Sequence, residues 1–578
     1  MNQPPSPPPS KLFIRSEVLA VIEFLATVET PSKQEKAKQI KRLRAIEDQK
    51  TVLEILLKEL QRAHSSQRLM QVVSELLMEI GSIEHLHDPL WELIRSIDTR
   101  DEVKDAANLV LRHLGDQTDP DLYLEYLHDP QGLINRETER MLEVASRNPE
   151  ALIDFIDFIF SLPVDEQLNL IQSLHADYEP DHLLNIYIPT MWADPPKPIQ
   201  ELILRNISQI RTKRAALFLY DYGQCLQAAD PEAEETLHRT LRRAVNELRI
   251  AGIYRDDAME SYRKETKQLH ELVQDSVVDK CYVTLSDGIG NQGLILSRKR
   301  ANGDVVMMSV AINDMHGIID CFGFYQLTEA DFAKIAEKFH EESSKFEATG
   351  AYCAYKLRHC EDLNRQNGLR IPYEYSCWKV LLGDLTLENH ESIDFETPSR
   401  QAANPAWVEL SANLYHHPDF QTWFLEEGDH PVVTQVLAEV DGVLTRLFSN
   451  ARQNGGTGGI FDQTEFTRCM DLCAFSLVKG LFTTDWKTLF VQRLADAVVL
   501  LNCQESKTFA GLAATEVMKL IEYPAEQEDA VLKTGFVQQF GRRCVEEYLL
   551  RRKQKATEEE QVLLTPAIEK LLDGWSIE

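Results

Sequence analysis

The chain consists mainly of short stretches in which apolar residues recur at the spacing of a helix. The clearest stretch covers residues 101–116, where six apolar residues step by three, one, three, one and three: Val103, Ala106, Ala107, Val110, Leu111 and Leu114. This spacing places them on one stripe of a helix, with the charged residues on the opposite side. Similar stripes lie within 52–60, 69–80 and 199–210. We therefore expect helices over nearly all of residues 12–276, separated by prolines and short polar breaks.

A short helix with one apolar stripe cannot bury that stripe alone, and stacking against neighbouring helices solves the problem. Residues 101–116 resemble the second helix of a HEAT-type repeat, a family that favours an acidic start, then valine with a basic residue, alanine, leucine and leucine–glycine. In this chain those positions are Asp101, Val103–Lys104, Ala107, Leu111 and Leu114–Gly115. The resemblance implies an α-solenoid or helical array over residues 12–276, and the alternative is an irregular helical bundle.

The pattern changes at residue 279, where apolar and polar residues begin to alternate as in strands. Strands are expected over 280–286, 293–298, 305–312 and 317–325, with a hairpin turn at 301–304. Helical spacing returns over three further segments, 328–344, 352–366 and 373–382. Residues 279–383 are therefore predicted to form a small α+β domain of antiparallel strands followed by helices.

The remaining segments complete a mostly α organisation. Residues 1–11 are rich in proline and serine and predict a disordered tail. Residues 384–405 are polar, contain two prolines and predict a linker. Residues 406–578 predict a C-terminal helical domain, with a helix pair over 486–501 and 509–521 and a last long helix over 536–555.

A glycine-rich motif, Gly288-Ile289-Gly290-Asn291-Gln292-Gly293, follows the first expected strand. In a dinucleotide-binding fold, these glycines open a helix whose N-terminus holds the pyrophosphate. Here the next residues, 294–297, read as a strand instead. A strand–glycine–strand layout also occurs in protein kinases, but Asn313 stands where the kinase lysine belongs. The motif is best interpreted as a glycine-rich hairpin turn, and no cofactor is predicted.

Four polar residues are expected to meet at one edge of the sheet and form the candidate binding cluster: Asp287, Asn313, Asp314 and His316. Polar groups on loops that a rigid sheet carries are where binding commonly takes place. The competing interpretation is a turn whose side chains cap their own backbone. No catalytic residue is assigned.

The same region also resembles, over about 50 residues, the opening of ribonuclease H-like nucleases, which bind divalent metal on a first-strand aspartate. The resemblance implies that Asp287 is the first carboxylate of a two-metal site. Asp314 and Asp320 lie nearby in the sequence, and the second carboxylate would come from the first helix: Glu329, Asp331 or Glu337. An aspartate followed by glycine is also a favoured turn dipeptide, so a plain acidic turn stays open.

Cysteine spacing indicates no metal centre. Cys469 and Cys473 share a helical face, but a structural zinc site needs further ligands at matching spacing, so two core cysteines are the better interpretation. The ten cysteines are scattered over 225–544, unlike the dense spacing of a disulfide-stapled domain. We expect them to be reduced and mostly buried.

The net charge and the hydropathy of the chain argue against some classes of binding partner. A net charge of −31 argues against nucleic acid and anionic membrane surfaces. No apolar run approaches the roughly 20 residues that span a bilayer, and the N-terminus lacks the apolar segment of a signal peptide. The sequence therefore predicts a cytoplasmic protein.

These features favour a non-catalytic scaffold or adaptor that binds protein partners on helical-repeat surfaces. Two alternatives stay open. One is a metal-dependent nuclease or phosphoryl hydrolase centred on Asp287, and the other is a regulatory module whose α+β domain responds to a ligand. The partner's identity and the oligomeric state are not fixed by the sequence.

Overall fold

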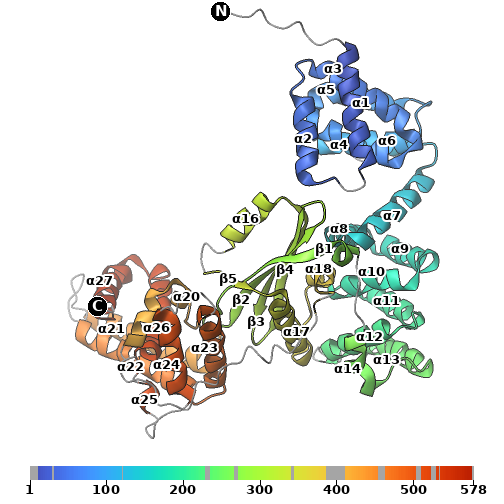
Figure 1. Ribbon diagram of the computed structural model, residues 1–578. Coiled ribbons are helices and arrows are strands. Elements are labelled where there is room, and N and C mark those ends of the chain that lie inside the picture. The colour runs from blue at the N-terminus through green and yellow to red at the C-terminus, as the bar shows by residue number, and fades with distance from the viewer. Residues whose placement is uncertain are drawn as a thin grey trace, which may run out of the picture.

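The computed structural model describes residues 11–28, 31–119, 122–227, 235–265, 271–339, 344–383, 385, 410–453, 462–502, 509–522, 529–532 and 534–575. Over these residues the chain is mostly helical and contains one small antiparallel sheet (Figure 1). This confirms the expected class of a mostly α protein with a small sheet domain. The predicted tail, apart from Lys11, and nearly all of the predicted linker lie outside the described residues.

The first helices, residues 11–126, form a body that we call the N-terminal group. Their apolar stripes meet in a core of their own, and the stripe of 101–116 is buried in it as its spacing predicts. The elements are α1 (Lys11–Thr27), α2 (Lys33–Arg44), α3 (Gln49–Arg62), η1 (Ala63–Ser65), α4 (Gln67–Ile80), α5 (Ile83–Arg95), α6 (Asp101–His113) and η2 (Leu122–Tyr126).

Residues 130–265 form a second group of helices with a separate core. The single helical region expected over 12–276 therefore contains two cores rather than one. We call this body the second group. Its elements are α7 (Pro130–Arg147), α8 (Pro149–Ser161), α9 (Val164–Asp177), α10 (Pro180–Trp192), α11 (Lys197–Gln209), α12 (Lys213–Gln227), α13 (Glu235–Ile250), η3 (Asp256–Ala258) and α14 (Met259–Glu265).

The sheet has the strand order β4-β3-β2-β1-β5, and its strand pairs are antiparallel. The four longer strands lie where alternation predicts them, although β1 begins four residues early. The three-residue strand β5 was not expected. The elements of this sheet unit are α15 (Glu271–Gln274), β1 (Ser276–Val283), β2 (Asn291–Arg300), β3 (Val305–Asn313), β4 (Gly317–Leu327), α16 (Glu329–Lys338), β5 (Phe346–Ala348), α17 (Gly350–Gln366), α18 (Tyr373–Trp378) and η4 (Lys379–Leu382).

The two faces of the sheet have different neighbours. The outer face packs against α16 in a small cluster that includes Ile295, Met307 and Phe332. The inner face packs against α17 and α18, and its apolar residues belong to the same continuous core as the C-terminal helices. The α+β domain and the C-terminal domain therefore share one core, although the sequence separates them by a linker.

The C-terminal helices, residues 410–575, form the third helical body, called the C-terminal group. The helix pair expected over 486–501 and 509–521 is present as α23 and α24, but α27 follows the helix that was expected to be the last. The elements are η6 (Ser411–His416), α20 (Pro418–Gln421), α21 (Pro431–Gln453), α22 (Gln463–Leu481), α23 (Trp486–Asn502), α24 (Phe509–Glu522), α25 (Asp529–Leu532), α26 (Gly535–Gln554) and α27 (Glu558–Trp575).

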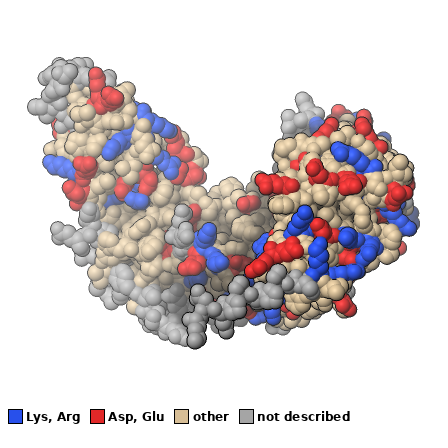
Figure 2. Space-filling model, turned by 90° about the horizontal axis from the view of Figure 1, so that it is seen from above, with Lys and Arg blue, Asp and Glu red and all other residues tan. Residues whose placement is uncertain are grey.

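The sheet unit connects the three helical bodies. Asp304, before β3, accepts a hydrogen bond from the backbone N–H of Lys33 (3.1 Å) and another from Gln326 Nε2 (2.6 Å), which ties the N-terminal group to the sheet. Glu150 of α8 accepts a hydrogen bond from the N–H of Tyr325 on the edge strand β4 (3.0 Å). Seen from above, the C-terminal group on the left and the N-terminal group on the right stand on either side of a hollow (Figure 2). In the part of the chain that the structure describes, no helix is both long enough and apolar enough to cross a bilayer.

A buried cation anchors one corner of the sheet. Arg298 on β2 is fully buried, and its guanidinium donates to Ser276 Oγ (3.0 Å) and to the carbonyls of Ser276 (3.1 Å) and Leu381 (3.1 Å). The neighbouring Lys299 lies on the opposite face, has a side chain that is 40% exposed, and pairs with Glu329. Both positions are therefore basic, but only Arg298 satisfies buried backbone groups.

We expect Arg298→Met to lower the free energy of unfolding by about 3 kcal/mol or more, because it leaves buried carbonyls without donors. Lys299→Met is the matched control and should change stability little, since its ion pair is exposed to solvent. Urea denaturation followed by circular dichroism measures both variants. Equal losses of stability in the two variants would contradict this role of Arg298.

Candidate functional site

Most of the predicted polar cluster comes together in the structure. Asp287 lies in the loop between β1 and β2, and Asn313 and Asp314 lie where β3 turns into β4. The two loops are neighbours because β2 and β3 pair with Asn291 opposite Asn313. The sheet thus positions these side chains at one end.

The carboxylate of Asp287 is used within its own loop. Oδ1 accepts hydrogen bonds from the N–H groups of Ile289 (3.0 Å) and Asn291 (2.8 Å), and Oδ2 accepts one from Asn291 Nδ2 (3.0 Å). Burial raises the pKa of Asp287 above its ordinary value, against the opposing effect of these donors. Asp287 therefore acts as a half-buried cap of the turn, a residue type and a role that turns favour.

Both the nitrogen and the oxygen of the Asn313 side-chain amide have hydrogen-bond partners. Nδ2 donates to the carbonyl of Ile289 (2.9 Å) and to Asn291 Oδ1 (3.0 Å). Oδ1 accepts from the N–H groups of Met315 (2.9 Å) and His316 (3.1 Å). The side chain is 4% exposed, so these four contacts account for its hydrogen-bonding groups without a ligand.

Asp314 is paired with an arginine that comes from α23 in the C-terminal group. Arg493 Nε donates to Asp314 Oδ2 (2.6 Å), and Nη2 donates to Oδ1 (2.8 Å). The same guanidinium donates to the carbonyls of Gly288 (2.5 Å) and Ile289 (3.2 Å). The side chain of Arg493 is only 2% exposed. This two-pronged charge pair is the strongest polar contact of the cluster.

Nothing in the local sequence indicates Arg493 as a member of the cluster. It lies 179 residues beyond Asp314, in a helix whose own pattern is largely apolar. The only available signal is a basic residue within an apolar helix, and such a residue normally needs a buried partner. Sequence reasoning therefore found the acidic side of the pair and missed the basic side.

His316 belongs to the cluster only through its backbone. Its N–H donates to Asn313, and its carbonyl accepts from Asn364 Nδ2 (3.1 Å), whereas the residue as a whole is exposed. The structure therefore brings Asp287, Asn313 and Asp314 together and leaves the imidazole of His316 on the surface.

The glycine motif allows two backbones to approach each other. The N–H of Gly288 donates to the carbonyl of Thr422 (3.1 Å), and a Cβ at Gly288 would lie 2.4 Å from the backbone nitrogen of Phe424. Gly290 has a φ of +91°, which glycine adopts without strain. The expected hairpin turn is present. Gly288 fits against the segment 422–424 of the C-terminal group, whereas Gly290 faces Asp314 and Arg493.

A second charge pair joins the same two bodies. Lys356 of α17 pairs with Asp496 of α23, one turn along the helix from Arg493. Burial alone would lower the pKa of Lys356, but Asp496 and Tyr352 raise it above its ordinary value. Two part-buried cation–carboxylate contacts thus hold α23 against the sheet unit.

Two of the three helix carboxylates proposed for a two-metal site, Glu329 and Asp331, lie elsewhere. Glu329 pairs with Lys299, and Asp331 accepts a hydrogen bond from Thr328 Oγ1 (2.8 Å). Lys299 is at the far end of β2 from Asn291, and eight residues of strand span about 27 Å. Glu329 and Asp287 are therefore at opposite ends of the sheet. Among the residues that the structure describes, no group of three or more His, Cys, Asp or Glu is placed to hold a metal ion.

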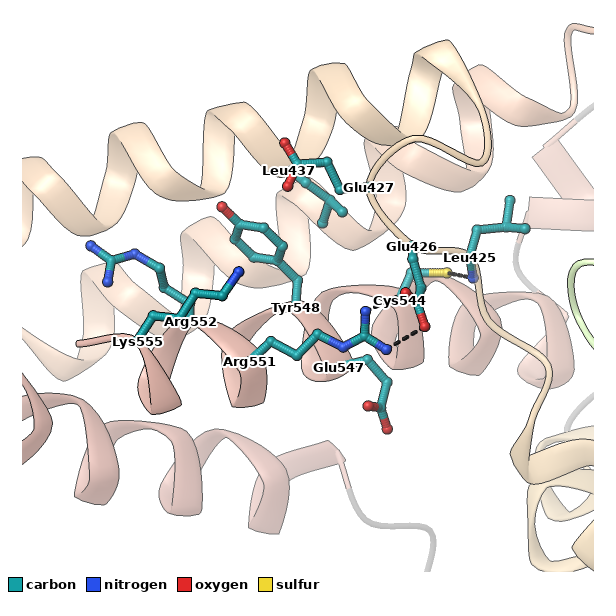
Figure 3. A pocket seen from close by; sticks show the side chains of 10 residues that line it. All are labelled: Leu425, Glu426, Glu427, Leu437, Cys544, Glu547, Tyr548, Arg551, Arg552 and Lys555. Atoms are coloured by element: carbon teal, nitrogen blue, oxygen red, sulfur yellow. Dashed lines mark hydrogen bonds and ion pairs between the residues drawn. The ribbon is translucent and has the colours of Figure 1, made fainter. Parts of the chain in front are cut away.

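Two hollows in the helical bodies are further candidates. One, of about 210 Å³, lies between α21, α26 and residues 425–427 (Figure 3). Its charged side chains are largely matched, since Arg551 pairs with Glu426 and Arg552 Nε with Asp441 Oδ1 (3.0 Å). The other, of about 410 Å³, is an open groove between α12 and α13. Small-molecule sites commonly have about 300–1,000 Å³, so only the groove reaches that size.

Comparison with protein-family models, with curated proteins and with solved structures gave no match to this chain. The function of this chain is therefore inferred from the contacts of the polar cluster and from the surfaces of the helical bodies.

We expect Arg493→Met to lower the free energy of unfolding by about 3–5 kcal/mol, because it leaves Asp314 and two carbonyls without their buried donor. Arg493→Lys keeps the charge but loses the two-pronged geometry, so it should recover only part of that loss. Denaturation of both variants and hydrogen exchange at residues 287–291 measure the effect. Wild-type protection of this loop in Arg493→Met would contradict the role given to the guanidinium.

The raised pKa of Asp287 predicts a pH dependence with a definite sign. Because the folded pKa exceeds the unfolded value of about 3.9, the stability from the protonated carboxyl is present below that value and is lost as the pH rises through the folded pKa. The unfolding free energy of the wild type relative to Asp287→Asn should therefore fall as the pH is raised above about 4. Urea titrations of both proteins between pH 4 and 7 measure this difference, and a difference that grows with pH would contradict the assignment.

Proposed function

We propose that this chain is a non-catalytic scaffold or adaptor, with HEAT-like stacked helices that bind protein partners. The observation that carries the proposal is that the polar cluster makes its hydrogen bonds and ion pair within the protein itself. The oxygens of Asp287 and Asp314 bind the chain's own backbone, Asn291 and Arg493, so the end of the sheet joins two bodies of the protein. The surfaces available to partners then belong to the helices.

Exposed apolar side chains on the helices support this proposal. In the second group, Val144 on α7 is 47% exposed and Phe158 on α8 is 37% exposed, and in the N-terminal group Leu109 on α6 is 50% exposed. Exposed apolar side chains that gather in one contiguous patch mark protein-binding faces. The hollow between the bodies adds a concave surface of the kind that helical arrays use for partners (Figure 2).

The net charge of −31 supports binding to other proteins rather than to nucleic acid, and we propose that the protein is cytoplasmic. A nuclease centred on Asp287 would require a helix carboxylate beside it, and Glu329 is instead paired with Lys299 at the other end of β2. No described contact favours that alternative over the scaffold.

Affinity capture with the full-length chain as bait tests the proposal. We expect at least one protein to be retained from a lysate of the source cells in near-stoichiometric amount. Hydrogen exchange of the full-length chain with that protein added should then slow on helices of the N-terminal and second groups. An unrelated protein of similar net charge, carrying the same tag, is the control for charge-driven retention.

Two results would count against a scaffold. One is the absence of any stoichiometric protein with the full-length bait. The other is slowed exchange confined to residues 287–291 and 313–317, which would show that the end of the sheet is itself the binding site.

A further inference from the structure

The groove between α12 and α13 has an apolar floor and is lined by two tyrosines, Tyr220 and Tyr254. Leu219 and Leu241 are buried at its base. Tyr254 forms one wall and is held by Arg249, whose guanidinium carbon lies 5.2 Å from the ring centre and which also pairs with Asp256 (2.9 Å). These contacts within the protein place Tyr254 beside the groove, which has a volume of about 410 Å³.

A glycine in the middle of α12 widens the groove. Glycine within a helix costs about 1 kcal/mol relative to alanine, so its presence needs a reason. At position 223 no neighbouring atom requires a glycine, because a Cβ built there would meet only Leu241 Cδ2, at an ordinary 3.5 Å. Gly223 lines the groove, so the missing side chain leaves space at the floor that another molecule can fill.

The rim of the groove carries a positive charge that is not neutralised by the described residues. On α13, Arg239 pairs with Glu235 (2.9 Å), and Arg249 pairs with Asp256. Arg242 lines the groove and is exposed, and no described residue pairs with it. In a chain with a net charge of −31, an unpaired arginine beside an apolar floor favours a ligand that is both apolar and acidic.

We propose that this groove binds an acidic amphipathic helix of a partner protein, with a leucine side chain over Gly223 and a glutamate of the same helix paired with Arg242. A third helix laid between two helices buries its apolar stripe in the way that helix-in-groove recognition requires. The proposal rests on the proposed scaffold function, and it names the place and the chemistry of one contact.

Fluorescence anisotropy with the full-length chain tests the charge requirement. The probe is a labelled 18-residue helical peptide with leucines at i, i+3, i+4 and i+7 and glutamates on the flanks, and the control peptide has lysine for each glutamate. We expect the glutamate peptide to bind at least tenfold more tightly than the lysine peptide. Arg242→Glu should reverse this order, and equal binding of both peptides to the wild type would overturn the proposal.

A matched pair of glycine substitutions tests the location. Gly223→Leu fills the floor of the groove, whereas Gly442→Leu makes the same change on α21 at a position with nothing within 4 Å. Both should keep or raise the melting temperature, because leucine favours a helix more than glycine does. Only Gly223→Leu should weaken the glutamate peptide, by at least tenfold, and unchanged binding in that variant would overturn the proposal.

The same variant separates this inference from the scaffold function. If a captured protein is lost from the Gly223→Leu bait and kept by the Gly442→Leu bait, the groove is the contact. If both baits keep it equally, the groove proposal fails while the scaffold function stands. Sedimentation of the chain that shows concentration-dependent dimers, removed by Gly223→Leu, would also overturn it, because the occupant would be a second copy.

Discussion

The buried guanidinium of Arg493 fixes how the sheet and the C-terminal helices meet. A charge withdrawn from water needs partners around it, and this one has both oxygens of Asp314 and two carbonyls of the glycine loop. Those four acceptors exist in one place only because β2 and β3 pair in register and bring two loops together. The hydrogen bonding of one side chain thus depends on the correct pairing of a sheet far from it in sequence.

The same residues that suggest chemistry in the sequence hold the protein together in the structure. Aspartates, an asparagine and a glycine loop are the groups that bind metals and phosphates in other proteins, and here they bind one another, Arg493 and the backbone of 422–424. The α12–α13 groove differs in kind, since Arg242 at its rim is exposed and unpaired among the described residues. An unpaired charge beside an empty apolar groove is a better sign of a missing binding partner than a polar sequence motif is.

Local pattern was sufficient for much of the fold. The stripe of 101–116 and the alternation of 305–312 each depend on residues close in sequence, and both lie in the elements that were expected. The strand β5 has three residues, too few for alternation to be visible, and it exists because β1 offers it an edge. Arg493 is harder to predict for a related reason: its partner lies 179 residues away, and the only local sign is a basic residue in a largely apolar helix.

The continuous core beneath the sheet limits which parts of the chain gene rearrangement could separate. The polar segment 384–405 resembles a domain boundary in the sequence, but the inner face of the sheet and the C-terminal helices bury the same apolar surface. A gene fragment that ended before this segment would leave that surface open to water. The N-terminal group has a core of its own, so gene rearrangement could exchange it far more easily. The segment that must stay together in such a rearrangement therefore runs from β1 to α27.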